Sequence, residues 1–135
     1  MEDLIRLLHE GGYSLIVANG EVDSFTRRGV SDLYKILNED PGYLVGASVA
    51  DKVVGKAAAA LMILGRIKEL YADVISVPAN TLLKESGIKV SYRTEVPHII
   101  NRAGTGWCPL ETLCYELQSP QECFVRIREF MNKKQ

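Results

Sequence analysis

The chain has 135 residues, of which 47% are hydrophobic and 24% are charged, and its formal net charge at pH 7 is −1. These values are typical of one globular domain with a buried core. So balanced a charge gives no general attraction to nucleic acid or to a membrane surface. We therefore expect a single domain over residues 1–135, with no clear nucleic-acid patch, no membrane partner and only local charge-based recognition.

The cysteines indicate a reducing compartment. Cys108, Cys114 and Cys123 lie in the last third of the chain with no paired spacing, which is typical of free thiols. The first residues are acidic and then amphipathic, unlike a signal peptide, and the longest apolar stretch, residues 57–65, is too short to span a bilayer. These features predict a cytoplasmic protein.

The first half of the chain predicts a helix, a β-hairpin, a second helix and a buried strand. Leucines at helical spacing precede Gly11-Gly12, and Asn19-Gly20 separates two β-rich runs over residues 13–18 and 22–27, which is a strong hairpin signal. A helix follows from Ser31 to the Pro41-Gly42 pair, and residues 43–49 predict a strand. Asp51 then fits the N-cap of a helix over residues 52–67 that is apolar on nearly every side.

The second half predicts alternating strands and helices. A strand over 70–77 leads into a helix from Pro78 to Gly87, and a strand over 88–92 leads into a loop over 94–107. Two further helices begin near Cys108 and Ser119. A hairpin followed by strand–helix units predicts an α/β fold, with a mixed sheet and helices on both faces.

One segment resembles a known sequence motif, beyond its pattern of hydrophobic residues. Residues 74–88 resemble the second zinc-site segment of cytidine-deaminase-like enzymes, where a strand ends in a Pro-Cys-x-x-Cys helix start. Pro78 keeps the proline, whereas Ala79 and Leu82 stand where the two thiolate ligands would be. Residues 55–58 also lack the zinc ligand and catalytic glutamate of the first segment. The resemblance implies a cytidine-deaminase-like fold in α-β-α layers, with no metal site, no cofactor and no zinc-dependent deaminase activity.

Nearly the full length is similar to an uncharacterised bacterial and archaeal family that shares this fold without zinc. The matching stretches are residues 51–57, 96–102 and 108–111. This resemblance implies the fold and assigns no activity. Because relatives of this fold commonly form dimers or tetramers, it also implies a homo-oligomer.

Two polar segments predict a site for a small anion. Lys52 and Lys56 are four residues apart, so both would lie on one face in the first turns of the helix predicted over 52–67, where an anion would offset their opposition to the helix dipole. The Gly-rich loop after Arg102 would let a ligand approach closely. Alternatively, the lysines only extend to water and the loop is an ordinary connection. The candidate ligand-binding residues are Asp51, Lys52, Gly55, Lys56, Asn101 and Arg102.

Two further residues could carry chemistry. Cys108 fits an N-cap position ahead of Pro109, where the helix dipole favours a thiolate, and Glu111 follows in the first turn. Three hypotheses stay open. The protein binds a nucleotide-like or other small anionic ligand, or it is an enzyme without zinc that uses Cys108 or Glu111, for example in acyl or glycosyl transfer, or it is an interaction module.

Overall fold

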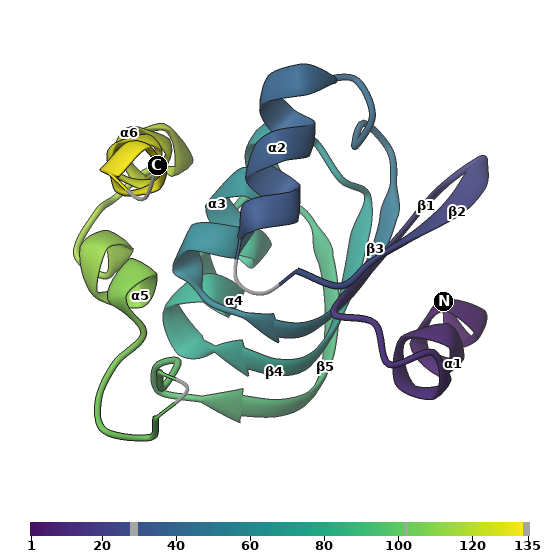
Figure 1. Cartoon of the computed structure of the whole chain (residues 1–135), viewed down its shortest axis with the longest axis horizontal. Coiled ribbons are helices and arrows are strands. Elements are labelled where there is room, and N and C mark those ends of the chain that lie inside the picture. The colour runs from purple at the N-terminus through teal and green to yellow at the C-terminus, as the bar shows by residue number, and fades with distance from the viewer. Residues whose placement is uncertain (28–29, 102, 134–135) are drawn as a thin grey trace.

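The computed structural model describes residues 1–27, 30–101 and 103–133. These residues form a mixed α/β fold around a five-stranded sheet with the strand order β2-β1-β3-β4-β5, as the sequence predicts at this level (Figure 1). The elements in chain order are α1 (Glu2–Glu10), β1 (Leu15–Asn19), β2 (Glu21–Phe25), α2 (Ser31–Glu39), β3 (Ser48–Val54), α3 (Lys56–Leu64), β4 (Glu69–Ser76), α4 (Val77–Glu85), β5 (Lys89–Val96), α5 (Pro109–Cys114) and α6 (Pro120–Lys133).

Strands β1 and β2 form the predicted hairpin. Asn19 pairs with Glu21, and Gly20 between them has a φ of 86°, a left-handed conformation that favours glycine. On its other side β1 pairs antiparallel with β3, whereas β3, β4 and β5 run parallel to one another. The carboxyl ends of the three parallel strands therefore meet at one edge of the sheet.

The two faces of the sheet are covered unequally. Helix α1 packs on one face against β1 and β3, where Leu4 and Leu8, one helical turn apart, contact Ile16 and Ala50. The larger core lies on the other face, with α3 at its centre and α2, α4, α5 and α6 packed against it (Figure 1). No helix in the described part of the chain is long and apolar enough to cross a membrane.

The boundary between β3 and α3 differs from the prediction. The predicted strand over 43–49 and the helix start at Lys52 are wrong, because β3 covers Ser48–Val54 and α3 begins at Lys56 with Gly55 as its N-cap. Strand β3 pairs with β1 as far as Asp51 and with β4 as far as Val54, and the β-branched Val53 and Val54 fit this pairing with β4, which outweighs the helical pattern. Asp51 therefore lies in a strand and caps no helix.

Strand β5 is longer than predicted and includes the start of the predicted loop over 94–107. It pairs with β4 from Lys89 to Val96, and most of its side chains are exposed. An exposed edge strand carries polar residues on both sides, so its sequence resembles that of a loop.

Candidate functional site

The N-terminus of α3 holds a carboxylate from the chain itself. Glu111 of α5 is 1% exposed, and its Oε1 accepts a hydrogen bond from the Lys56 backbone N–H at 2.8 Å. Its Oε2 accepts a hydrogen bond from the Ile99 N–H at 2.7 Å. Gly55 permits this approach, because a Cβ there would lie 3.3 Å from Oε1. The position at which we expected an external anion is thus filled by Glu111.

The Lys56 side chain is also engaged inside the protein. The residue is 7% exposed, and its Nζ donates hydrogen bonds to the carbonyl oxygens of Tyr115, at 2.9 Å, and of Leu117. These carbonyls follow the end of α5, so the ammonium group satisfies acceptors that the helix leaves unpaired. The contacts of Lys56 and Glu111 join the start of α3 to residues 99–117.

Replacing Lys56 with methionine should therefore lower the free energy of unfolding, by roughly 1–2 kcal/mol, because two partly buried carbonyls lose a charged donor while the apolar stem is kept. A lysine that only opposed the helix dipole would have the opposite effect, and its loss would stabilise the protein slightly. Urea unfolding of the variant beside Lys84→Met, which changes an exposed lysine of α4, measures the difference. Equal stability of Lys56→Met and the wild type would contradict the structural role.

Asp51 is buried away from any solvent-facing site. It pairs with Leu15 of β1 and is 8% exposed. Burial raises its pKa to about 8, the N–H groups of Val53 and Lys52 oppose this rise, and the charge of Asp73 adds to it. Lys52, the next residue, is half-buried and lies in β3, whereas Lys56 is the first residue of α3. The two lysines therefore do not share a helix face, contrary to the prediction from the sequence.

Asn101 organises its own loop. Its Oδ1 accepts a hydrogen bond from the Thr105 N–H at 3.1 Å, and its Nδ2 donates to Thr105 Oγ1 at 3.2 Å. Gly104 in this turn has a φ of 71°. The proposed role of Asn101 in ligand binding thus competes with a role in the turn, and Arg102 lies outside the described residues.

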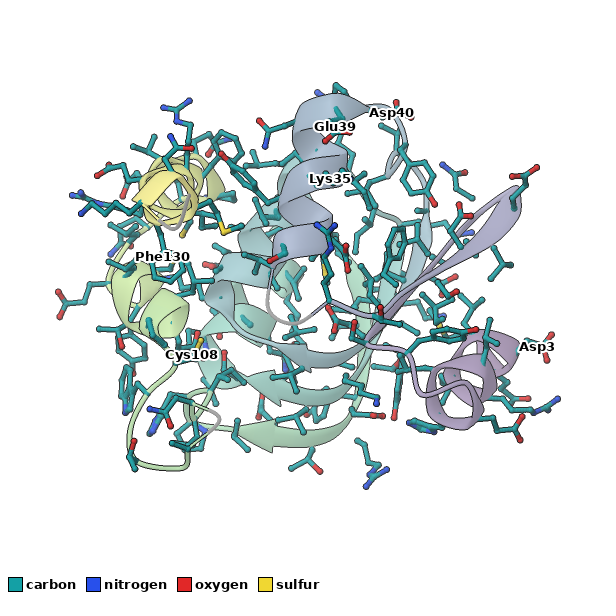
Figure 2. All side chains as sticks on the ribbon, viewed as in Figure 1. Asp3, Lys35, Glu39, Asp40, Cys108 and Phe130 are labelled. Atoms are coloured by element: carbon teal, nitrogen blue, oxygen red, sulfur yellow. The ribbon has the colours of Figure 1, made fainter. Side chains whose placement is uncertain are left out.

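Cys108 is the N-cap of α5, as predicted, and Pro109 is the first helical residue. Figure 2 places it beside α5, where it is half-buried, whereas Cys114 and Cys123 are fully buried. Its backbone N–H donates to the Ile99 carbonyl and its own carbonyl accepts from the Thr112 N–H. Cys108 is therefore the thiol that solvent reaches most easily among the three.

The residues at the two thiolate positions belong to the hydrophobic core. Ala79 and Leu82 lie on the buried side of α4, which begins at Val77, one residue before the predicted Pro78. The N-cap is Ser76, whose Oγ accepts a hydrogen bond from the Ala79 N–H at 3.3 Å. Within the described ranges, no three His, Cys, Asp or Glu side chains lie together in a way that could hold a metal ion.

An apolar hollow of about 390 Å³ lies at the carboxyl ends of the parallel strands. Val53 and Ile100 in its wall are 48% and 49% exposed. Helix α1 supplies none of the described residues that line it, although His9 of α1 contacts Asp73, the residue before Val74. We call this hollow the valine groove, and its lining residues are Val53, Val74, Val96, Pro97, His98, Ile99 and Ile100.

A break in the strand alternation opens the groove. Two consecutive residues in β3, Lys52 and Val53, are less buried than Asp51 and Val54 on either side. The same pattern occurs at Asp73–Val74 in β4. Val54 and Ile75, which follow the pairs, belong to the main core, and Ala50 and Tyr71, two residues before Lys52 and Asp73, pack with α1 on the other face. By strand alternation, both members of each pair therefore face away from the main core. The groove could not be predicted from the sequence, because Val53 fitted a predicted helix and Val96 a predicted loop, and a single strand carries no sign of the break.

Aromatic rings extend the groove on one side. The ring of His98, which lines the groove, is stacked on Trp107 with their centroids 4.1 Å apart and an interplanar angle of 22°. The ring of Trp107 in turn packs against that of Tyr115, with the two centroids 4.7 Å apart. Trp107 and Tyr115 are 38% and 42% exposed, so the stack forms an apolar surface open to solvent.

A second hollow, of about 460 Å³, lies between β2 and α2 and has a different character. Charged side chains of both signs line it, including Lys35, Glu39 and Asp40, which Figure 2 shows along α2 and just after it. Arg27 and Asp32 form an ion pair at 3.8 Å across it. Of the residues that the structure describes, four carboxylates and two cations line the second hollow, so negative charge is in excess there and the hollow does not suit an anionic ligand.

Comparison with known proteins identifies the family. The family model described as "Domain of unknown function (DUF1893)" matches residues 3–131. The chain belongs to the DUF1893 family. The DUF1893 domain is also similar to the crystal structure of a DUF1893 family protein (TM1506) from Thermotoga maritima, with 28% sequence identity and a TM-score of 0.86, over 96% of this chain and 90% of the other. No curated protein matches the chain.

The expected site residues of this DUF1893 domain fall into separate places. Gly55 and Lys56 meet Glu111 inside the protein, and Asp51 is buried in the sheet. Lys52 directly precedes Val53 at the valine groove. The structure thus separates the lysines that the sequence placed together and brings Lys52 to an apolar groove instead.

Proposed function

We propose that this DUF1893 domain is a binding protein that takes a small ligand with a planar ring, such as a nucleobase, in the valine groove. The observation that carries the proposal is an apolar hollow, open to solvent, at the carboxyl ends of three parallel strands. In open α/β sheets, ligands bind outside the carboxyl ends of the strands. The volume of about 390 Å³ is that of a small-molecule site.

The stacked rings support a planar ligand in particular. His98 lines the groove and already stacks on Trp107, so a ring in the groove would add a third member to the His98–Trp107 stack. Stacking of a base on an aromatic side chain contributes about 1–3 kcal/mol. The valine and isoleucine side chains would cover the edges of the ring.

The cytidine-deaminase-like arrangement stays part of this proposal. Helices α3 and α4 begin directly after the neighbouring parallel strands β3 and β4, at N-caps Gly55 and Ser76. Both helix starts therefore lie at the sheet edge that holds the groove. A nucleotide-like ligand is consistent with this arrangement, but its contacts differ from those expected, because Glu111 and the Tyr115 carbonyl engage Lys56.

The same geometry weighs against Glu111 as a catalytic group. Both of its oxygens accept backbone N–H hydrogen bonds, and the residue is 1% exposed. A general acid or base has to come within hydrogen-bond reach of a substrate. Cys108 is half-buried at a helix of six residues, and no histidine is described in hydrogen-bond contact with it.

Trp107 provides a direct test, because it is the only tryptophan of the chain and stacks on a residue of the groove. We expect adenosine or uridine at millimolar concentration to change its emission saturably, with excitation at 295 nm, and to raise the melting temperature as ligand binding to the native state requires. Val53→Asp, which places a charge in the groove, should abolish the response. Val22→Asp, a similarly exposed valine of β2, should retain it. If no nucleoside alters the emission or the melting temperature, the groove is not a ring-binding site.

A further inference from the structure

A row of charged residues borders the valine groove. In β4, Val74 pairs with Val53 of β3 and with Thr94 of β5. Two residues earlier, Ala72 pairs with Asp51 and Tyr92 in the same way. The residues between these two sets, Lys52, Asp73 and Arg93, therefore lie level with one another in the three adjacent strands. This row is one residue away from Val53 and Val74 on the groove floor.

The charged row faces the same side of the sheet as the groove. Lys52 and Asp73 precede Val53 and Val74 within the pairs that face away from the main core. Burial and the hydrogen bond to Asp73 raise the pKa of Tyr71 to about 12, and the positive charge of Arg93 opposes this rise. Residues that are level on adjacent strands point to the same side of a sheet, so Arg93 lies on the face of Asp73, where Tyr71 packs against α1.

The central carboxylate of the row is held toward α1. The Tyr71 hydroxyl donates to Asp73 Oδ1 at 2.7 Å, and Nε2 of His9 lies 2.7 Å from the same oxygen. Among residues 1–27, 30–101 and 103–133, neither Lys52 nor Arg93 has an ion pair or a side-chain hydrogen bond. Two cations without a charged partner therefore flank the edge of an apolar groove.

We propose that Lys52 and Arg93 together bind the acidic group of the ligand whose ring occupies the valine groove, so that the ligand is a small planar organic anion. This inference rests on the proposed function and names the class of ligand. The two residues are on strands separated by β4, about 10 Å apart along the sheet, and their long side chains can converge on one phosphate or carboxylate. Arginine supplies a bidentate donor pair and lysine a compact charge.

The charge balance agrees with this assignment. Among the described residues, the groove lining contains no carboxylate and no permanent cation, so the electrostatic preference of this lining comes from the neighbouring row. In that row Lys52 and Arg93 carry two positive charges and Asp73 carries one negative charge. An anion at the rim would meet a net positive charge, and removal of the Asp73 charge should strengthen its binding.

Three adenosine compounds distinguish the contribution of the ring to the binding affinity from that of the acidic group. We expect Trp107 emission to report dissociation constants about tenfold lower for AMP and for adenosine 5′-carboxylate than for adenosine at low ionic strength, since a charge-assisted contact contributes about a factor of ten. Added salt should weaken the binding of both acids and leave adenosine unchanged. Similar affinities of the phosphate and the carboxylate would define the site as one for organic anions, and preference for one would identify the acidic group.

Variants locate the anion contact. Lys52→Gln and Arg93→Gln should each weaken AMP about tenfold without affecting adenosine, whereas Asp73→Asn should strengthen AMP relative to adenosine by a fewfold. Lys89→Gln, an exposed lysine at the other end of β5, serves as the matched control and should change neither ligand.

The outcomes distinguish this inference from the proposed function. If adenosine binds and AMP binds no more tightly, or if Lys52→Gln and Arg93→Gln leave the AMP advantage intact, the cation pair is wrong and the groove stands. If ribose 5-phosphate, tested by thermal shift, binds as tightly as AMP and both lose affinity in the two variants, the cation pair stands and the ring site is wrong. Absence of binding by all of these compounds overturns both.

Discussion

Replacing Glu111 with alanine is expected to lower the free energy of unfolding by roughly 3–5 kcal/mol, because each of its two backbone N–H contacts is a hydrogen bond to a charged group. The backbone N–H groups of Lys56 and Ile99 would remain inside the protein with no acceptor from residue 111. Helix α3 would also lose the negative charge at its N-terminus. Urea unfolding followed by circular dichroism measures this change.

Two further variants show whether the loss comes from the carboxylate. Glu111→Gln keeps the shape and one acceptor oxygen, so its loss should be smaller than that of alanine. Glu116→Ala, an exposed glutamate just after α5, should change stability by no more than about 0.5 kcal/mol. A loss below about 1 kcal/mol for Glu111→Ala would show that water or another group replaces the carboxylate.

The second large effect concerns pH, because Asp51 is expected to destabilise the folded protein as the pH rises. Burial raises its folded pKa from 3.8 to about 8, so the folded protein keeps this proton over a range in which the unfolded chain has released it. Between these two values the folded state binds more protons, and the free energy of unfolding falls by up to about 1.4 kcal/mol per pH unit. The penalty is absent below about pH 4 and complete above about pH 8.

Asp51→Asn isolates this effect, since the amide keeps an acceptor for the nearby N–H of Val53 and carries no charge. We expect the variant to exceed the wild type in free energy of unfolding by several kcal/mol at pH 8 and to match it near pH 4. The difference between the two proteins, measured from pH 4 to 8, removes the contribution of other titrating groups. A difference that does not depend on pH would show that Asp51 is solvated or paired.

Local signals in the sequence predicted much of the fold. Asn19-Gly20 located the hairpin, because few residues other than glycine adopt the φ of 86° found at Gly20. Cys108-Pro109 located the start of α5. The signal failed at residues 52–54, where pairing of Val53 and Val54 with β4 decides the conformation and the partners lie about 20 residues later in the sequence.

The candidate site was harder to predict because its contacts are distant in the chain. Glu111 bonds to Lys56, 55 residues earlier, so nothing near either residue shows that the helix N-terminus is occupied. The valine groove depends on a break in the alternation that β3 and β4 share. Lys52 was identified from its charge, but for a helix that does not begin there, and its proposed partner Arg93 lies in a strand that was only partly predicted.

The carboxylate at the start of α3 also determines whether anions from solution can bind at this helix N-terminus. Glu111 is tethered to the helix end through the fold, so its effective local concentration exceeds that of free phosphate or sulfate at millimolar levels. A free anion would have to displace a group that pays no translational entropy to bind. The start of α3 is therefore closed to soluble anions, whereas Lys52 and Arg93 have no charged partner among the described residues and stay open to them.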